Sequence, residues 1–104
     1  MFLGKVVGTL VSTQKEKSLD GLKFLVVQRL TVANETDSGY VVAADAVGAG
    51  LDEVVMVASG SSARQTVLTD KRPCDAVIMA IVDSWEIGGR EIYRKTPADS
   101  AWAS

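Results

Sequence analysis

Short runs of Val, Leu, Ile and Thr alternate along the chain with polar segments rich in Gly, Asn, Asp and Ser. Such runs, bounded by turn-forming residues, predict β-strands. Strands are expected over residues 2–12, 22–31, 40–44, 53–58, 76–85 and, as a short final strand, 90–95. No stretch has the period of a long amphipathic helix. The pattern therefore predicts an all-β fold, a compact five-stranded OB-like barrel with a short C-terminal extension.

The predicted strands at residues 22–31, 53–58 and 76–85 are apolar on both faces. Successive side chains of a strand point to opposite faces, so Leu25 and Val27 lie on the other side from Phe24 and Val26. The fourth and fifth predicted strands repeat this pattern. A barrel has one interior, and the sequence supplies no helices to cover a second apolar face. We therefore expect another subunit to provide the cover.

The length suits one domain with a marginal core. A domain of 104 residues buries only about two-thirds of the surface of its unfolded chain, which leaves little stability to a monomer. Residues 1–95 are predicted to form the barrel domain and residues 96–104 a mobile C-terminal tail. Trp102 in that tail is a candidate docking anchor, although chain ends are usually mobile unless they are tied down.

Charge and composition disfavour several partners. With 11 Lys and Arg against 13 Asp and Glu, the net charge of -2 offers no basic footprint for nucleic acid. The longest apolar run, residues 76–82, is far shorter than the roughly 20 residues of a membrane-spanning helix. The N-terminus lacks the features of a secretory signal, and the single cysteine, Cys74, excludes an intrachain disulfide. A cytoplasmic protein without membrane or nucleic-acid partners is expected.

No arrangement of residues indicates catalysis. The chain has no His, so the commonest general base and metal ligand is missing, and neither a metal site nor a cofactor is predicted. Asp75 and Asp83 flank a predicted strand and would lie roughly 26 Å apart at about 3.3 Å per residue, too far to cooperate. They are interpreted as strand boundaries, and Cys74 as a small structural residue rather than a nucleophile.

The glycines of Gly48-Ala49-Gly50 suggest two interpretations. Glycines allow backbone amides to approach a phosphate, but neither the further glycine of a dinucleotide loop nor the Lys and hydroxyl residue of a P-loop follows. A tight turn that needs positive φ or close backbone packing is favoured.

An ordered set of motifs spans nearly the whole chain. It comprises GKVVGTLVST at residues 4–13, LDGLK at 19–23, DAVGAGLDEVV at 45–55, GSSAR at 60–64, PCDA at 73–76 and IVDS at 81–84. In this order the motifs resemble the bacterial microcompartment vertex family, which includes the carboxysome and ethanolamine-compartment pentamers. Many members of that family have glycine where Asp52 stands.

The resemblance implies a five-stranded OB-like barrel, a homopentamer and a place at the five-fold vertices of an icosahedral shell, beside hexameric shell proteins of the same compartment. It implies no catalysis. The residues that the matching motifs nominate for assembly are Val47, Gly48, Ala49, Gly50, Glu53, Gly60, Ser61, Ser62, Ala63 and Arg64.

Glu53 and Arg64 are the charged members of that set. One hypothesis pairs them with each other or with a neighbouring subunit, and the alternative leaves them as ordinary solvated charges. The compartment type also has two interpretations. Val54 and Val55 resemble the catabolic compartments, whereas residues 93–95 resemble carboxysome-type members, and the balance slightly favours a catabolic compartment.

The alternative function is an OB-like module that binds single-stranded nucleic acid or oligosaccharide. Such a module needs a basic groove with aromatic stacking platforms. The chain has two Phe, two Tyr and two Trp, scattered along its length, and acidic residues outnumber basic ones. The shell-protein interpretation is therefore preferred.

Overall fold

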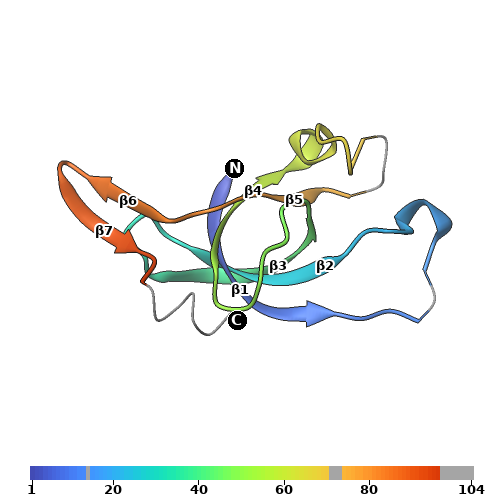
Figure 1. Cartoon of the computed structure of the whole chain (residues 1–104), viewed down its shortest axis with the longest axis horizontal. Helices are drawn as coiled ribbons and strands as arrows, with labels where there is room; N and C mark the ends of the chain where they lie inside the picture. The colour runs from blue at the N-terminus through green and yellow to red at the C-terminus, as the bar shows by residue number, and fades with distance from the viewer. Residues whose placement is uncertain (14, 71–73, 97–104) are drawn as a thin grey trace.

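The computed structural model describes residues 1–13, 15–70 and 74–96 (Figure 1). Seven strands and two short 3-10 helices follow one another along the chain. They are β1 (Phe2–Leu10), η1 (Lys17–Leu19), β2 (Phe24–Leu30), β3 (Thr36–Asp45), β4 (Val54–Ser59), η2 (Gly60–Arg64), β5 (Ala76–Ile81), β6 (Ser84–Ile87) and β7 (Arg90–Arg94). The all-β prediction is confirmed.

The first five strands close a barrel in the order β1-β2-β3-β5-β4, and β4 pairs again with β1. All neighbours are antiparallel except β3 and β5. Strands β1 and β2 approach closely at Gly4, where an added Cβ would overlap Val27 Cγ1 and lie 3.1 Å from the Gln28 carbonyl oxygen. The register of β1 against β2 shifts at a bulge between Val6 and Gly8, and the pairing then continues to Leu10.

The barrel interior is filled by small and medium aliphatic side chains. The cluster comprises Val6, Leu25, Val27, Ala43, Ala49, Val55, Val57, Ala76 and Ile78, each at most 4% exposed. Alternate residues of each strand point inward, as the period of a strand requires. No buried side-chain nitrogen or oxygen among the described residues lacks a hydrogen-bond partner.

A second cluster lies on the outer side of the barrel and corrects part of the sequence interpretation. It comprises Ala44, Ala58, Ala63 and Val77, with Phe24 and Met79 packed against it. Ala63 belongs to η2, so this short helix covers part of the outer face of β3, β4 and β5. We expected another subunit to cover all the outward apolar residues. The chain covers some of them itself because GSSAR forms a helical turn that was not predicted.

Two strand boundaries also differ from the prediction. The run at residues 76–85 forms two strands, with a break at Val82 and Asp83. At this break the Val82 N–H donates to Val54 O at 2.8 Å. The Lys95 N–H donates to Asp83 O at 2.7 Å. Strand β3 starts earlier than predicted, over polar residues 36–39. There the Gln28 side chain donates to the carbonyls of Asp37 and Gly39, at 2.7 and 3.1 Å. Asp75 and Asp83 lie just outside strands, as predicted.

Strands β6 and β7 form a separate two-stranded hairpin that extends from the barrel (Figure 1). The Trp85 indole N–H donates to Val32 O at 2.8 Å, and the Trp85 and Tyr93 rings stack with centroids 5.1 Å apart. These contacts fix the base of the hairpin. The division between a domain at 1–95 and a tail at 96–104 stays a prediction, because residues 97–104, including Trp102, lie outside the described part of the chain.

Candidate functional site

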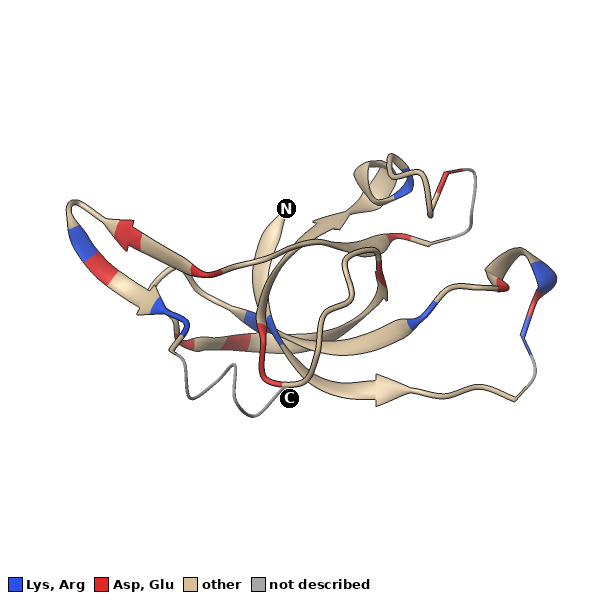
Figure 2. Cartoon of the chain, in the orientation of Figure 1, with Lys and Arg blue, Asp and Glu red and all other residues tan. Residues whose placement is uncertain are grey.

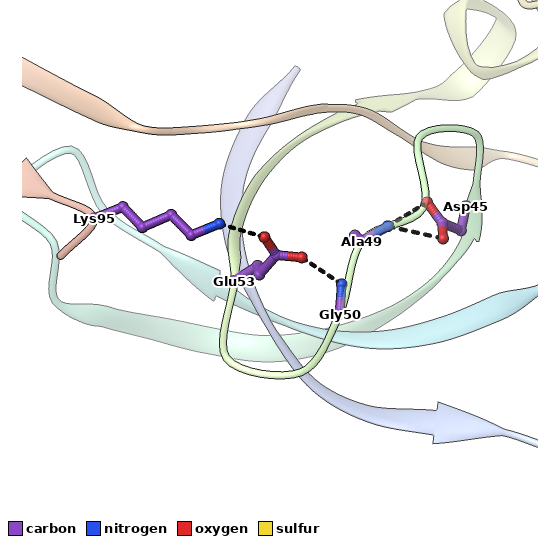
Figure 3. Close-up of polar contacts among 5 residues, drawn as sticks. All are labelled: Asp45, Ala49, Gly50, Glu53 and Lys95. Carbon is purple, nitrogen blue, oxygen red and sulfur yellow. Dashed lines mark hydrogen bonds and ion pairs between the residues drawn. The ribbon is translucent and has the colours of Figure 1, made fainter. Parts of the chain in front are cut away.

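The loop between β3 and β4 is organised by the carboxylate of Asp45. Its Oδ1 accepts the backbone N–H groups of Val47 and Gly48 at 3.1 and 3.0 Å. The Ala49 N–H donates to both carboxylate oxygens, Oδ1 at 3.2 Å and Oδ2 at 3.0 Å (Figure 3). Gly48 has φ +77°, so the predicted turn with positive φ is confirmed. The amides that a phosphate would need already bind a carboxylate of the same chain. This geometry argues against a nucleotide loop.

A second carboxylate, Glu53, fixes the other end of the loop. Its Oε1 accepts the Gly50 N–H at 2.6 Å, and its Oε2 accepts Lys95 Nζ at 2.5 Å (Figure 3). The Glu53 and Lys95 side chains are only 13% and 19% exposed. Burial alone would raise the pKa of Glu53, but the hydrogen bonds from Lys95 and Gly50 and the Lys95 charge together hold it below its ordinary value. The hydrogen bond to Glu53 raises the pKa of Lys95, against the opposing effect of burial.

The loop backbone is also tied to β1. The Asp52 N–H donates to Val6 O at 2.8 Å, and the Val6 N–H donates to Glu53 O at 3.0 Å. Asp52 has φ +68°, a left-handed conformation that favours glycine and that Asp tolerates better than most residues. Glycine adopts this conformation without steric cost, so Asp52 occupies a position where glycine would be the least strained residue. Ala49, 3% exposed, points into the barrel core.

The GSSAR motif forms η2 and caps the outer cluster. Ala63 is fully buried, and its carbonyl accepts Thr69 Oγ1 at 2.6 Å. The Arg64 guanidinium donates to Cys74 O at 3.2 Å. Cys74 is buried beside this segment, as the structural interpretation of that residue requires. Gly60 begins the helix with φ +64°, whereas Ser61 and Ser62 remain exposed.

The structure does not join the candidate residues into one site. Val47, Gly48, Ala49, Gly50 and Glu53 precede β4 or lie at its start, and Gly60, Ser61, Ser62, Ala63 and Arg64 follow its end. The hypothesis that Glu53 and Arg64 pair within one chain is wrong, because Glu53 binds Lys95 and Arg64 binds a backbone carbonyl. Pairing with a neighbouring subunit remains a hypothesis.

The sequence did not predict the roles of three residues in this region. These are Asp45, which organises the loop, Lys95, which pairs with Glu53, and Thr69, which is buried and donates to Ala63 O. An Asp immediately before a glycine-containing turn is a known signal for a side chain that binds its own backbone, so Asp45 was detectable. Lys95 lies 42 residues from Glu53 and gives no local signal.

The described residues contain neither a group of three or more acidic, His or Cys side chains placed to hold a metal, nor a helix long and apolar enough to cross a membrane.

Comparison with known families decides the class of this protein. Residues 1–83 match the family described as ethanolamine utilisation protein EutN/carboxysome. The chain belongs to the EutN/CcmL family. The carboxysome shell vertex protein CcmL of Gloeobacter violaceus is 48% identical over 91% of this chain and 95% of its own length. Its solved structure superposes with a TM-score of 0.88, covering 91% of this chain and 98% of that one.

Two further relatives are described as bacterial microcompartment shell vertex proteins. The microcompartment shell vertex protein GrpN of Rhodospirillum rubrum is 51% identical over 83% of this chain and 97% of its own length. A solved structure described as pentameric GrpN is 49% identical, with a TM-score of 0.76, and covers 84% of this chain and 100% of that one. EutN of Salmonella typhimurium is 36% identical over 91% of this chain and 96% of its own length.

This membership makes the chain a structural shell protein of the vertex type and not an enzyme. It does not strengthen the slight preference for a catabolic compartment. A carboxysome relative and GrpN both share about half of their residues with this chain, whereas EutN shares 36%.

Proposed function

We propose that five copies of this chain close into a ring that occupies the five-fold vertices of a bacterial microcompartment shell in the cytoplasm. The observation that carries the proposal is the apolar surface left uncovered on a barrel whose GrpN relative is described as pentameric. Hexameric shell proteins of the same compartment would surround each ring. Flat hexagonal tiles cannot enclose a volume without five-fold points, and a pentamer supplies them.

The exposed apolar surface lies on β1, β2 and β3. Val7, Leu10 and Val42 are 44%, 43% and 46% exposed, although they stand on barrel strands. Val26 lies between Gly8 and Val42 in the strand register and shares their face. Helix η2 covers outward residues of β4, β5 and the end of β3, but it leaves Val7, Leu10 and Val42 exposed. A neighbouring copy would remove this patch from water at roughly 25 cal/mol per Å² of apolar area.

A closed ring also fits the small size of the domain. Each subunit of a ring uses two different patches, one for each neighbour, and the rotation closes after the last copy. An obligate interface of about 2,000 Å² or more would add considerable apolar burial to a chain whose own core is made of Val, Ala, Leu and Ile.

The alternative binding module is not supported by the placement of the aromatic residues. The rings of Trp85 and Tyr93 stack on each other, and the Arg29 guanidinium lies 3.9 Å from the centre of the Phe2 ring. Phe24 packs against the outer cluster. Figure 2 shows acidic and basic residues interspersed along the ribbon. These rings are therefore engaged within the chain rather than arranged as platforms for stacked bases.

The mass of the native assembly tests this proposal. Light scattering after size exclusion, over a hundredfold range of concentration, is expected to give about five times the 11.0 kDa of one chain. A variant that ends at Thr96 should keep that mass if residues 97–104 are dispensable for the ring. A chain that remains monomeric at all concentrations would contradict the proposed function.

A further inference from the structure

An apolar groove lies beside the uncovered face of the barrel. Its volume is about 510 Å³. The apolar side chains that line it are Leu10, Val11, Leu19, Leu22, Phe24 and Val42. Lys15 and Lys23 also line it, and neither forms an ion pair with another described residue. The groove therefore presents an apolar floor with two cations available to a partner.

The β6–β7 hairpin lies at the other end of the long axis, away from the β1–β2 connection that bounds the groove (Figure 1). A two-stranded hairpin is marginally stable without packing against another element. Trp85 and Lys95 tie its base to the rest of the chain, but Ile87 near its turn is 49% exposed. The hairpin thus carries an apolar side chain that is half-exposed.

Two glutamates face each other across this hairpin. Glu86 is the register partner of Glu91, and like charges directly opposite in a strand pair are destabilising. Glu91 is compensated by Arg94, whose Nε lies 2.5 Å from its carboxylate. Glu86 is exposed and forms no ion pair within the described part of the chain. A cation supplied from outside the chain would relieve this repulsion.

We infer that the β6–β7 hairpin of one copy docks in the groove of the next copy, with Ile87 against Leu10 and Val42, and Glu86 near Lys15 and Lys23. The inference rests on the proposed ring and names the two unlike surfaces that such a ring requires. An apolar residue beside an uncompensated carboxylate matches an apolar groove lined by two lysines. The contact would also pack a neighbouring copy against Ile87, which is 49% exposed.

A paired-cysteine experiment tests the contact directly. In a Cys74→Ala background, the double variant Leu10→Cys with Ile87→Cys should form disulfides between copies on mild oxidation. Denaturing electrophoresis without reductant should then show a ladder that ends at five chains. The control replaces Ile87→Cys with Val67→Cys, because Val67 is fully exposed but lies on the segment after η2. That control should remain at one chain.

A charge-swap series provides an independent readout. Glu86→Lys should weaken each contact between neighbouring copies about fivefold, the upper range for a partly exposed ion pair, and this factor multiplies over the contacts of the ring. Adding Lys23→Glu should restore the contact, whereas the control Asp70→Lys should leave it unchanged. Both series are measured against the mass of the unmodified assembly.

The outcomes separate the two proposals. An unmodified chain that stays monomeric would overturn the ring and the contact together. An unmodified pentamer that gives no ladder with the cysteine pair and no response to Glu86→Lys would overturn the hairpin–groove contact and leave the ring intact.

Discussion

The carboxylates of Asp45 and Glu53 hold the β3–β4 loop from its two ends. Asp45 binds three consecutive backbone amides. Glu53 binds the Gly50 amide together with Lys95 (Figure 3). Asp45 and Ala49 are buried, so the loop is part of the barrel's core structure as well as its surface. Asp45 and Glu53 thus fix the conformation of the loop. Val47 and Leu51 lie on it with exposed side chains.

Removing the Glu53 charge should destabilise the fold in a pH-dependent way. Glu53→Gln is expected to lower the free energy of unfolding by about 1–3 kcal/mol at neutral pH, because Lys95 loses a charged partner in a mostly buried site. The pKa of Glu53 is lowered from 4.5, so the wild-type advantage is complete above that pH and is lost as pH falls through the folded-state pKa. The pKa of Lys95 is raised from 10.5, so its contribution is lost only as pH rises above that value.

Denaturant unfolding of both proteins at equal concentration, from about pH 3 to pH 9, measures this difference. Glu35→Gln, at an exposed position, is the control and should show little change. A difference between wild type and Glu53→Gln that is the same at pH 3 and pH 7 would contradict the role of the ion pair.

Gly4 should tolerate no side chain. Gly4→Ala would place a methyl group into Val27 and against the Gln28 backbone, and overpacking of this kind costs about 1–3 kcal/mol. Gly8→Ala is the matched control, because its Cβ would lie 3.7 Å from Val26 Cβ, an ordinary contact distance. Thermal unfolding should show a lower midpoint for Gly4→Ala only. Equal midpoints for the two variants would contradict the close approach of β1 and β2.

At the scale of elements, short-range patterns predicted most of the barrel. Alternating Val, Leu and Ile runs identified all five barrel strands because each has an apolar inward face. The start of β3 was missed because residues 36–39 are polar, and their pairing depends on Gln28 from β2. The break at Val82 and Asp83 was not predicted, because the apolar run continues up to Val82. The hydrogen bonds at the break are made with Val54 and Lys95, which are distant in the sequence.

Helix η2 explains why apolar residues occur on both faces of β4 and β5. Ala63→Leu should overpack the cluster of Ala44, Ala58 and Val77 and lower the free energy of unfolding by about 1–3 kcal/mol. Ser62→Leu, one residue earlier and exposed, should change it by no more than about 0.5 kcal/mol. Denaturant unfolding compares the two, and an equal loss in both variants would show that η2 is not a packed cover.

At the scale of the whole molecule, the fold divides the outward apolar residues into two groups. Those around η2, on β4, β5 and the end of β3, are covered by the same chain, whereas Val7, Leu10 and Val42 remain exposed. The sequence pattern indicated a second apolar face but not this division, because the covering segment is a five-residue helix in which only Ala63 is buried. The uncovered group, the groove and the extended hairpin together are the features that a ring of identical copies would use.

Shell closure tests the central claim most directly. Electron cryotomography would compare microcompartment shells from cells that produce this chain with shells from otherwise identical cells that lack it. The proposed vertex function predicts closed polyhedra with the chain, and open sheets or elongated tubes without it, because flat tiles alone supply no five-fold points. Closed polyhedra of normal shape in cells without the chain, and without any other vertex protein, would contradict it.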